Sequence, residues 1–426
     1  MRTTDPSHRR AVEAFWTELD RRGHIYESEH EGWYSVNDET FVPKTALTEQ
    51  ISRTSGLKIL LSQETGHPVE WTKERNYHFR LSNFTGRLLD HYTSSPKSIL
   101  PGSRYRDVIR ALESGLDDLS ISRPRDRLEW GIPVPADPSQ TIYVWLDALV
   151  GYLTKASYPW KEGENKLWPA DVHVIGKDIV RFHCIYWPAF LMAAELPLPK
   201  TVLTHAHWTM NRVKMSKSLG NVVDPFMALK RFGPDCMRYY LFGYGGLTND
   251  RDYSSTDVIK RYKTELQFQL GNLMSRIMSS KFDMASSIKH LHSPQSSKTQ
   301  EIANAIDEAR ETFAKSMDEC QFENAAKSIF HLVGYANNYM QLKEPWAIPA
   351  GEKKDMIIAD IAEIARVCGI LLQPIMPGKA SAMLSALDVH ASQRSWECAA
   401  YKADLTYGMR RRPGPQHLFP PLESYK

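Results

Sequence analysis

Apolar residues recur at helical spacing near the start of the chain. Between residues 8 and 22 the apolar positions include Val12, Phe15, Trp16 and Leu19. This spacing predicts a helix, and Gly23 behind it suits the C-cap position. Short β-like stretches follow at residues 32–41 and 67–77, and helical patterns return at 84–92 and 105–112. The pattern therefore predicts one helix and then a mixed α+β segment.

Two later passages have the pattern of a strand followed by a helix. Residues 141–145 lead into a helical stretch at 147–154, and residues 172–175 lead into a helix that extends to about residue 192. Another strand is predicted at residues 201–208. Strands that alternate with helices are typical of a parallel sheet, in which ligands bind at the carboxyl ends of the strands.

The pattern changes after Ser254. Long helical periodicities cover residues 255–281, 298–319, 322–342 and 353–374, which predicts a helical bundle. With 426 residues, of which 42% are hydrophobic, the chain is long enough for two or three domains. No apolar run approaches the roughly 20 residues of a membrane span, so we expect no membrane partner.

Charge and cysteine content exclude only a few classes of function. The formal net charge of +3 is too small to indicate a polyanionic partner by itself. The five cysteines are far apart and form no CxxC pair, which argues against a zinc knuckle and a disulfide framework and suits a reducing compartment. The basic opening segment lacks an apolar region, so neither a signal peptide nor a persuasive transit peptide is visible.

The sharpest chemical signal is the run Lys214-Met215-Ser216-Lys217-Ser218, with Gly220 close behind. Two ammonium groups and two hydroxyls on such a loop can wrap a triphosphate and counter its charge as pyrophosphate leaves. The run is similar to the signature loop of class I aminoacyl-tRNA synthetases. This resemblance implies catalytic roles for Lys214, Ser216, Lys217 and Ser218, with Lys217 also binding ATP. The alternative is a solvated basic turn.

The segment from Trp145 to Tyr152 resembles the part of methionyl-tRNA synthetases that walls the amino-acid pocket. Ala148 and Tyr152 are four residues apart and share one face of a helix. An aromatic wall suits a flexible thioether, which gains from contacts between sulfur and aromatic rings. The resemblance implies that Trp145, Ala148 and Tyr152 bind methionine. The alternative is an ordinary core helix.

Residues 176–188 resemble the same family. The glycine allows a tight turn, Asp178 is a natural helix N-cap, and Ile179 and His183 project one turn apart on one face. The resemblance implies that Ile179 and His183 contact methionine and that three residues lie against ATP, namely Gly176, Lys177 and Asp178. A lone histidine at such a position would more often be a core residue.

Two further segments resemble the family's nucleotide and tRNA contacts. Residues 204–209 look like the strand on the adenine side, which implies that His205 and Trp208 bind ATP, although the histidine could equally be a surface residue. Residues 270–276 resemble the start of the anticodon-binding bundle, where Asn272 and Arg276 can face one groove. Trp346 matches the aromatic residue on which an anticodon base stacks. The alternatives are a polar helix face and a buried tryptophan.

The resemblance also implies the fold class. We expect an α/β fold with a partial doubly wound, Rossmann-type nucleotide-binding sheet and an α+β connective insert, followed by an all-α anticodon-binding bundle. The expected parts are 1–24 (remnant of the first half of the catalytic domain), 25–123 (insert), 124–250 (second half with the signature loop), 251–390 (helical domain) and 391–426 (tail). Because the first cysteine, Cys184, lies beyond the insert, we expect no bound zinc. The insert resembles the organellar branch, which implies a mitochondrial matrix address, with the cytoplasm as alternative.

The chain departs from the family's pattern at its start. The HIGH-type motif and the Thr-Gly-Thr-Asp-Glu-His-Gly type segment do not occur in the sequence, so we expect a truncated form with open sheet edges and poor stability. Two interpretations follow. One is a partial form of a ligase that uses ATP with Mg²⁺ to activate methionine and load it onto tRNA(Met); the other is a non-catalytic short form that binds tRNA. A related class I enzyme for another apolar amino acid is disfavoured by the shortness of the insert.

Overall fold

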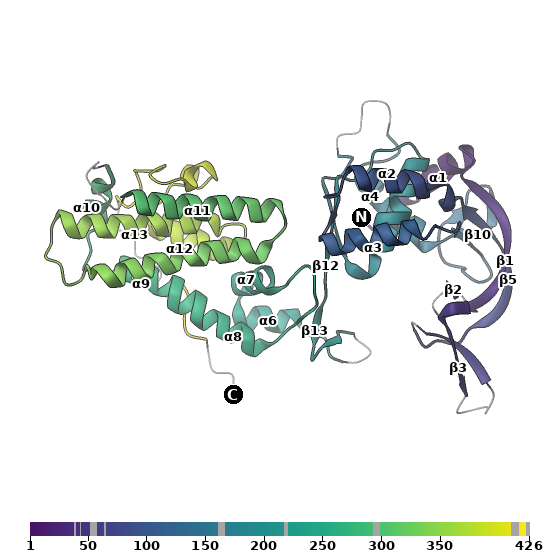
Figure 1. Cartoon of the computed structure of the whole chain (residues 1–426), viewed down its shortest axis with the longest axis horizontal. Coiled ribbons are helices and arrows are strands. Elements are labelled where there is room, and N and C mark those ends of the chain that lie inside the picture. The colour runs from purple at the N-terminus through teal and green to yellow at the C-terminus, as the bar shows by residue number, and fades with distance from the viewer. Residues whose placement is uncertain are drawn as a thin grey trace. The chain divides into compact units, whose positions relative to one another are not determined.

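The computed structural model describes residues 1–37, 40–42, 44–51, 58–63, 65–160, 167–216, 220–292, 299–409 and 417–422. The chain forms two compact units, Met1–Thr204 and His205–Lys426. Figure 1 shows that strands and helices mix in the first unit, whereas long helices dominate the second. Among the described residues, no helix is long and apolar enough to cross a bilayer.

The first unit begins with the predicted amphipathic helix. Helix α1 spans Pro6–Arg21 and buries the apolar stripe that the sequence indicated. Gly23 has a φ of +74°, and its amide bonds to the carbonyl of Asp20 at 2.8 Å. A residue at this position must adopt a left-handed conformation, which glycine does without strain. The prediction of the helix and of its glycine stop is confirmed.

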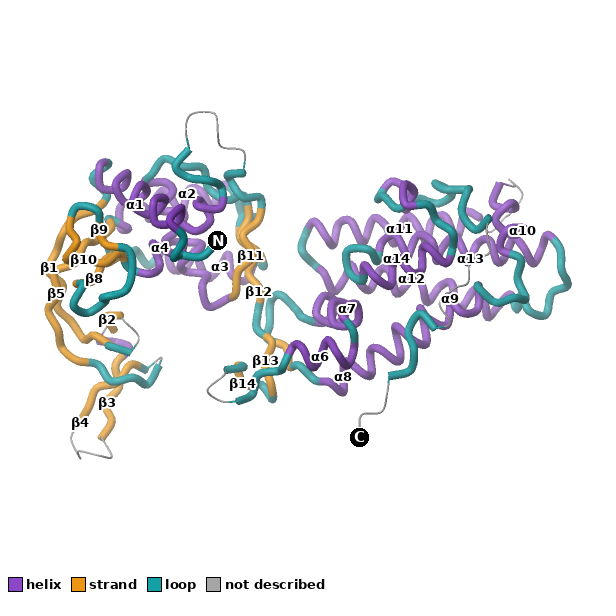
Figure 2. Tube along the Cα trace, turned by 180° about the vertical axis from the view of Figure 1, so that it is seen from behind, coloured by secondary structure: helices purple, strands orange, loops and turns teal. Residues whose placement is uncertain are grey.

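A long antiparallel ribbon follows, as Figure 2 shows in orange. Strand β1 (Ile25–Ser35) pairs with β5 (Glu70–Phe79) from Ile25 opposite Phe79 to Tyr34 opposite Glu70. The sheet order is β2-β1-β5-β7, with β2 at Thr40–Val42 and β7 at Leu119–Ser120. A separate hairpin joins β3 (Leu47–Ile51) to β4 (Lys58–Ser62). Helices α2 (Thr85–Ser94) and α3 (Gly102–Glu113) confirm the two expected helices.

The parallel sheet is smaller than expected. It has the order β11-β12-β6, with β11 at Val172–Gly176, β12 at Thr201–His205 and β6 at Ile99–Leu100. The strand expected at 141–145 is β10 (Asp137–Ile142), which ends earlier and lies antiparallel between β8 (Ser122–Pro124) and β9 (Pro133–Val134). The reason is local, because neighbouring segments of the chain supply both partners of β10. Helix α4 (Val144–Lys155) starts directly afterwards.

The helix after Gly176 has three kinds of turn. A 3₁₀ turn, η3 (Lys177–Ile179), precedes a π-helix, η4 (Phe182–Tyr186), and the α-helix α5 (Trp187–Ala193). Gly176 occupies the N-cap position without a side-chain cap, so the prediction that Asp178 caps this helix was wrong. Pro188 has no amide hydrogen for the carbonyl of Cys184. The hydroxyl of Tyr92 donates to that carbonyl at 2.5 Å instead.

The second unit begins with a small sheet of order β14-β13-β15. Its strands are β13 (Trp208–Met210), β14 (Val213–Lys214) and β15 (Arg251–Asp252). The strand expected at 201–208 is therefore divided between β12 and β13. Helices α6 (Pro225–Phe232) and α7 (Pro234–Tyr244) lie between β14 and β15 in sequence.

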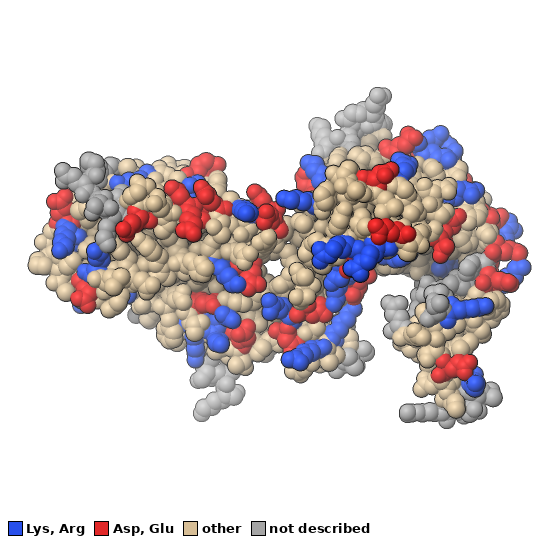
Figure 3. All heavy atoms as spheres, in the orientation of Figure 1, with Lys and Arg blue, Asp and Glu red and all other residues tan. Residues whose placement is uncertain are grey.

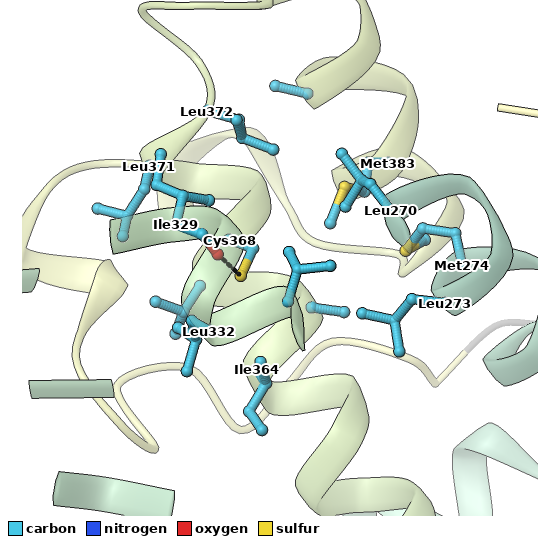
Figure 4. Close-up of a cluster of buried hydrophobic side chains, with 14 of the residues drawn as sticks. Leu270, Leu273, Met274, Ile329, Leu332, Ile364, Cys368, Leu371, Leu372 and Met383 are labelled. Carbon is cyan, nitrogen blue, oxygen red and sulfur yellow. Dashed lines mark hydrogen bonds between the residues drawn. The ribbon is translucent and has the colours of Figure 1, made fainter. Parts of the chain in front are cut away.

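A continuous helical rod connects this sheet to the bundle (Figure 1). It consists of α8 (Ser255–Arg261), the π-helical η6 (Tyr262–Gly271) and α9 (Asn272–Ile277). The bundle helices are α10 (Met284–Lys289), α11 (Thr299–Asp318), α12 (Phe322–Lys343), α13 (Glu352–Leu371) and α14 (Pro377–Ala386). The four predicted helical stretches are confirmed, with ends shifted by a few residues. Figure 4 shows their shared core, in which Leu270, Leu273 and Met274 of the rod lie near Cys368 of α13.

Candidate functional site

The wall residues predicted for methionine lie on three neighbouring elements of the first unit. Trp145 of α4 stacks on Phe182 of η4, with ring centroids 3.5 Å apart and an interplanar angle of 17°. Ala148 and Tyr152 follow on α4; Ala148 is exposed, and Tyr152 is 37% exposed, so most of its side chain is covered. Ile179 ends η3 and is half-buried. Phe182 lies inside a run already singled out in the sequence, yet helical spacing alone did not indicate its contact with Trp145.

A hydrogen-bonded chain fixes the protons of this wall. The hydroxyl of Tyr152 lies 2.8 Å from Nε2 of His183, and Nδ1 of His183 lies 2.9 Å from the carbonyl oxygen of Ile179. A carbonyl can only accept, so Nδ1 carries the hydrogen. Burial lowers the pKa of His183, which favours the neutral ring. Nε2 then accepts, and Tyr152 donates its proton to it.

His173 is a buried neighbour that the sequence did not indicate. Its ring meets that of Tyr152 edge-on at 4.1 Å, and neither ring nitrogen has a hydrogen-bond partner among the described residues. Burial, with a smaller contribution from His183, lowers the pKa of His173 to about 4. Burial also raises the pKa of Tyr152. At neutral pH these three side chains are therefore uncharged, which suits an apolar, polarizable ligand.

The opposite face of α4 is held by α1. His8 is fully buried, with Nε2 2.5 Å from a carboxylate oxygen of Asp147 and Nδ1 2.9 Å from the hydroxyl of Thr154. Gly151 lies between these contacts, and a Cβ there would be 3.2 Å from the Met1 side chain. These residues lie one turn apart along α4, so α1 sets the position of the helix that carries the wall. Because His8 is 139 positions from Asp147 and 146 positions from Thr154, the sequence pattern did not predict these contacts.

The residues predicted for ATP are divided between the units. Lys177 is half-buried and Asp178 is exposed in the turn that follows β11. His205 is an exposed residue at the end of β12, and Nδ1 lies 2.8 Å from the carbonyl of Ala206. The ring of Trp208 stacks on Tyr240 of α7 at 5.4 Å. Because the indole ring packs on Tyr240, the backbone of Trp208 in β13 is the part suited to hydrogen-bond to an adenine edge.

The signature loop is tied at its base. A two-residue turn, Asn211-Arg212, joins β13 to β14 with positive φ at both residues, as type I′ hairpins require. Asn221 accepts from the amide of Ser216 at 2.8 Å and donates to the carbonyl of Lys214 at 3.2 Å. Its side chain therefore bridges the loop entry and exit. Lys217 and Ser218 lie outside the described residues.

The three residues predicted for the anticodon lie on two neighbouring elements. Asn272 is exposed and Arg276 is half-buried on α9. Trp346 follows α12, whose last turn ends at Glu344 in a left-handed conformation. The guanidinium of Arg276 lies over the Trp346 ring at 4.9 Å from its centroid. Trp346 is 40% exposed, so it does not close the core of the bundle.

Charge is distributed differently on the two units. Figure 3 shows lysine and arginine side chains gathered over α3, which carries Arg104, Arg106 and Arg110, whereas both signs are interspersed over the helical bundle. No group of three or more His, Cys, Asp or Glu among the described residues could hold a metal ion. The zinc-free insert stays a prediction.

Comparison with protein families finds matches to two segments of the chain. Residues 1–278 match the family of class I tRNA synthetases of the M type, and residues 292–422 match the anticodon binding domain of methionyl tRNA ligase. The Rossmann-like α/β fold and the helical domain are those of a class I tRNA synthetase. The chain belongs to the methionyl-tRNA synthetase family. Asn272 and Arg276 fall within the first match and Trp346 within the second.

Relatives of known name align along almost the entire chain. The probable mitochondrial methionine–tRNA ligase of Neurospora crassa is 44% identical over 99% of this chain and 71% of its own length. The human mitochondrial methionine–tRNA ligase is 39% identical over 99% of this chain and 75% of its own. Mycobacterium tuberculosis methionyl-tRNA synthetase in complex with methionyl-adenylate superposes with a TM-score of 0.88 at 36% identity, over 99% and 82% of the chains. The expected truncation and the missing motif stay predictions.

Proposed function

We propose that this protein is a methionine–tRNA ligase. In the first step the carboxylate of methionine attacks the α-phosphate of ATP, which forms methionyl-adenylate and releases pyrophosphate. In the second step a ribose hydroxyl of the tRNA terminal adenosine attacks the aminoacyl carbonyl and releases AMP. The reaction is class I chemistry, and positioned groups that stabilise charge supply most of its catalysis.

The observation that carries the amino-acid specificity is the neutral wall of Trp145, Tyr152 and His183. Because the Tyr152 proton is donated to His183 and the stacked Trp145 presents an aromatic surface, the wall offers rings and lone pairs but no charge. A thioether matches such a surface better than a charged side chain would. Ala148 and Ile179 complete the methionine contacts in this proposal.

The ATP contacts follow from chemistry and family membership. The turn of Gly176, Lys177 and Asp178 lies against the nucleotide, and His205 and the backbone of Trp208 bind on the adenine side. The signature loop contributes Lys214, Ser216, Lys217 and Ser218, of which Lys217 binds the phosphates. ATP enters with Mg²⁺, whose charge offsets that of the departing pyrophosphate.

The tRNA(Met) contacts are those of an unstacked anticodon loop. Asn272 and Arg276 carry the amide and guanidinium groups that suit base edges, and Trp346 offers a ring for stacking. The contact between Arg276 and Trp346 supports this role because it holds both groups at one place. We further propose a mitochondrial address, which the names of the relatives support, and an insert without zinc, since residues 1–183 contain no cysteine.

The test is methionine-dependent exchange of pyrophosphate into ATP by the purified chain, followed by charging of tRNA(Met). Exchange that needs methionine, is not supported by leucine or isoleucine, and is lost in Lys217→Ala would support the proposal. Exchange with another apolar amino acid would contradict the specificity. A folded protein that binds tRNA(Met) without exchange would favour the tRNA-binding alternative.

A further inference from the structure

An exposed aromatic ring lies on the rod one turn before the predicted anticodon residues. Phe268 of η6 is 63% exposed. The other exposed residues of η6 are polar, namely Lys263 and Thr264. Isolated exposed apolar residues are common on protein surfaces, so exposure alone indicates nothing. Its position relative to the tRNA residues is what distinguishes Phe268.

The rod has a buried face and an outer face. Leu266 and Leu270 are completely or almost completely buried, and Figure 4 shows Leu270 among the side chains of the bundle core. Phe268 is two residues from each of them, which places it on the opposite side of the helix. The core therefore does not need this ring. A smaller residue at 268 would leave the packing of the rod unchanged.

The outer face aligns Phe268 with the anticodon residues. Phe268, Asn272 and Arg276 follow one another at intervals of four, so each lies roughly one turn from the next. The wide π-helical turn at this point is fixed, because Asn337 of α12 donates to the carbonyl of Gln269 at 3.2 Å. Such π-helical segments are frequent at functional sites. The ring is thus exposed, and the element that carries it is hydrogen-bonded to α12.

We propose that Phe268 is a stacking platform for an unpaired base of the tRNA anticodon loop, next to the base held by Arg276 and Trp346. This inference rests on the proposed function. On the face that Figure 3 shows, basic and acidic side chains are interspersed over the bundle, so contacts to exposed bases would add affinity there beyond charge attraction. Every base has a π-face, so stacking adds affinity without reading the sequence. Phe268 would then strengthen binding equally for tRNAs that differ in anticodon.

The experiment compares equilibrium binding of a tRNA(Met) transcript to the full chain and its variants. Phe268→Ala is expected to weaken binding about 5- to 150-fold, the range that corresponds to one lost base stack. Phe268→Tyr keeps the ring and should bind within about twofold of the original chain, whereas Phe268→Leu should be as weak as Phe268→Ala. Trp130→Ala, which removes a 75% exposed aromatic residue from the first unit, is the matched control and should bind normally.

A second transcript with an altered anticodon separates affinity from specificity. Phe268→Ala should weaken binding of both transcripts by the same factor, whereas Trp346→Ala should reduce the preference for tRNA(Met). Unchanged binding by Phe268→Ala beside a weakened Trp346→Ala would overturn this inference and leave the proposed function intact. Normal affinity in Phe268→Leu, or a change only in the oligomeric state on light scattering, would also overturn it, the latter in favour of contact between copies of the chain.

Discussion

The buried ion pair of α13 allows a quantitative prediction about the bundle. Glu363 and Arg366 both have fully buried side chains. Nε and Nη2 of Arg366 donate to the two carboxylate oxygens at 2.8 and 2.6 Å, and the same guanidinium also donates to the carbonyls of Cys398 and Ala400. The carboxylate further accepts from the amide of Lys402 at 2.6 Å and the hydroxyl of Tyr407 at 2.9 Å. The pair thus joins the segment after α14 to the bundle.

Removal of one partner should lower the free energy of unfolding more than removal of both. Arg366→Met leaves a buried carboxylate with only two hydrogen-bond donors, so the free energy of unfolding should fall by about 3–5 kcal/mol. Glu363→Met leaves a buried guanidinium without its carboxylate and should lower the free energy of unfolding by a similar amount. The double variant contains no buried charge. It leaves two donors and two carbonyls unpaired at about 1 kcal/mol each, so we expect a total loss of about 2–4 kcal/mol. The coupling free energy should therefore exceed about 2 kcal/mol.

Amide hydrogen exchange of peptides from α13 measures this without assuming that both units unfold together. The matched control is the exposed pair of Arg9 and Glu13 on α1, which are 2.8 Å apart, with exchange followed in α1. Its coupling should stay below about 0.5 kcal/mol because water screens both charges. If the two single losses in α13 simply add in the double variant, the account of the buried pair is wrong.

Three further predictions concern pH, the signature loop and the methionine wall. Burial raises the pKa of Asp360 from 3.8 to about 6. The stability that the protonated carboxyl contributes is therefore present below pH 4 and lost as pH rises through 6. In urea titrations, Asp360→Asn should raise the free energy of unfolding by about 1–3 kcal/mol at pH 8 and by almost nothing at pH 4. Asn221→Ala removes the side chain that bridges the signature loop, so the kcat of pyrophosphate exchange should fall about 5- to 30-fold while the methionine KM stays unchanged. An unchanged kcat would exclude a positioning role for Asn221. Tyr152→Phe leaves Nε2 of His183 without its donor, so the methionine KM should rise about 5- to 30-fold while the ATP KM stays constant. An equal rise in both KM values would contradict the assignment of Tyr152 to the methionine pocket.

Helices with one clear apolar stripe were predictable from the sequence. Helices α1 and α11 present such a stripe to a core, and local spacing alone determines which residues are buried. Sequence spacing could not reveal η4 or η6, because a π-helical turn depends on partners elsewhere. In η4 the hydroxyl of Tyr92, on α2, donates to the carbonyl that Pro188 leaves without an amide, and in η6 Asn337 of α12 donates to the carbonyl of Gln269.

Residues for the candidate site could be proposed from the sequence wherever a short run carries the chemistry, and their roles stay predictions. The runs at 145–152, 176–183 and 214–218 could be named residue by residue, and Trp346 and Arg276 do meet. The supporting contacts could not be named. His8 reaches Asp147 across 139 positions of the chain, and no periodicity encodes such a separation. The sheet that contains β10 was misjudged for a related reason, since alternation of strands and helices does not say which strands pair.

In the second unit, paired strands and a helical rod connect the two predicted functional regions. The signature loop leaves β14, which pairs with β13, and β13 pairs with β15. Three residues after Asp252 the rod begins, and it ends beside Trp346. Glu265, in the middle of the rod, accepts hydrogen bonds from Tyr239 at 2.7 Å and from Tyr244 at 2.6 Å, both on α7. The rod is thus hydrogen-bonded to α7, which precedes β15 in the chain, so the predicted anticodon residues and the base of the signature loop belong to elements of the same unit. In the proposed function, the anticodon contacts and the base of the signature loop are therefore joined by hydrogen-bonded elements of one unit.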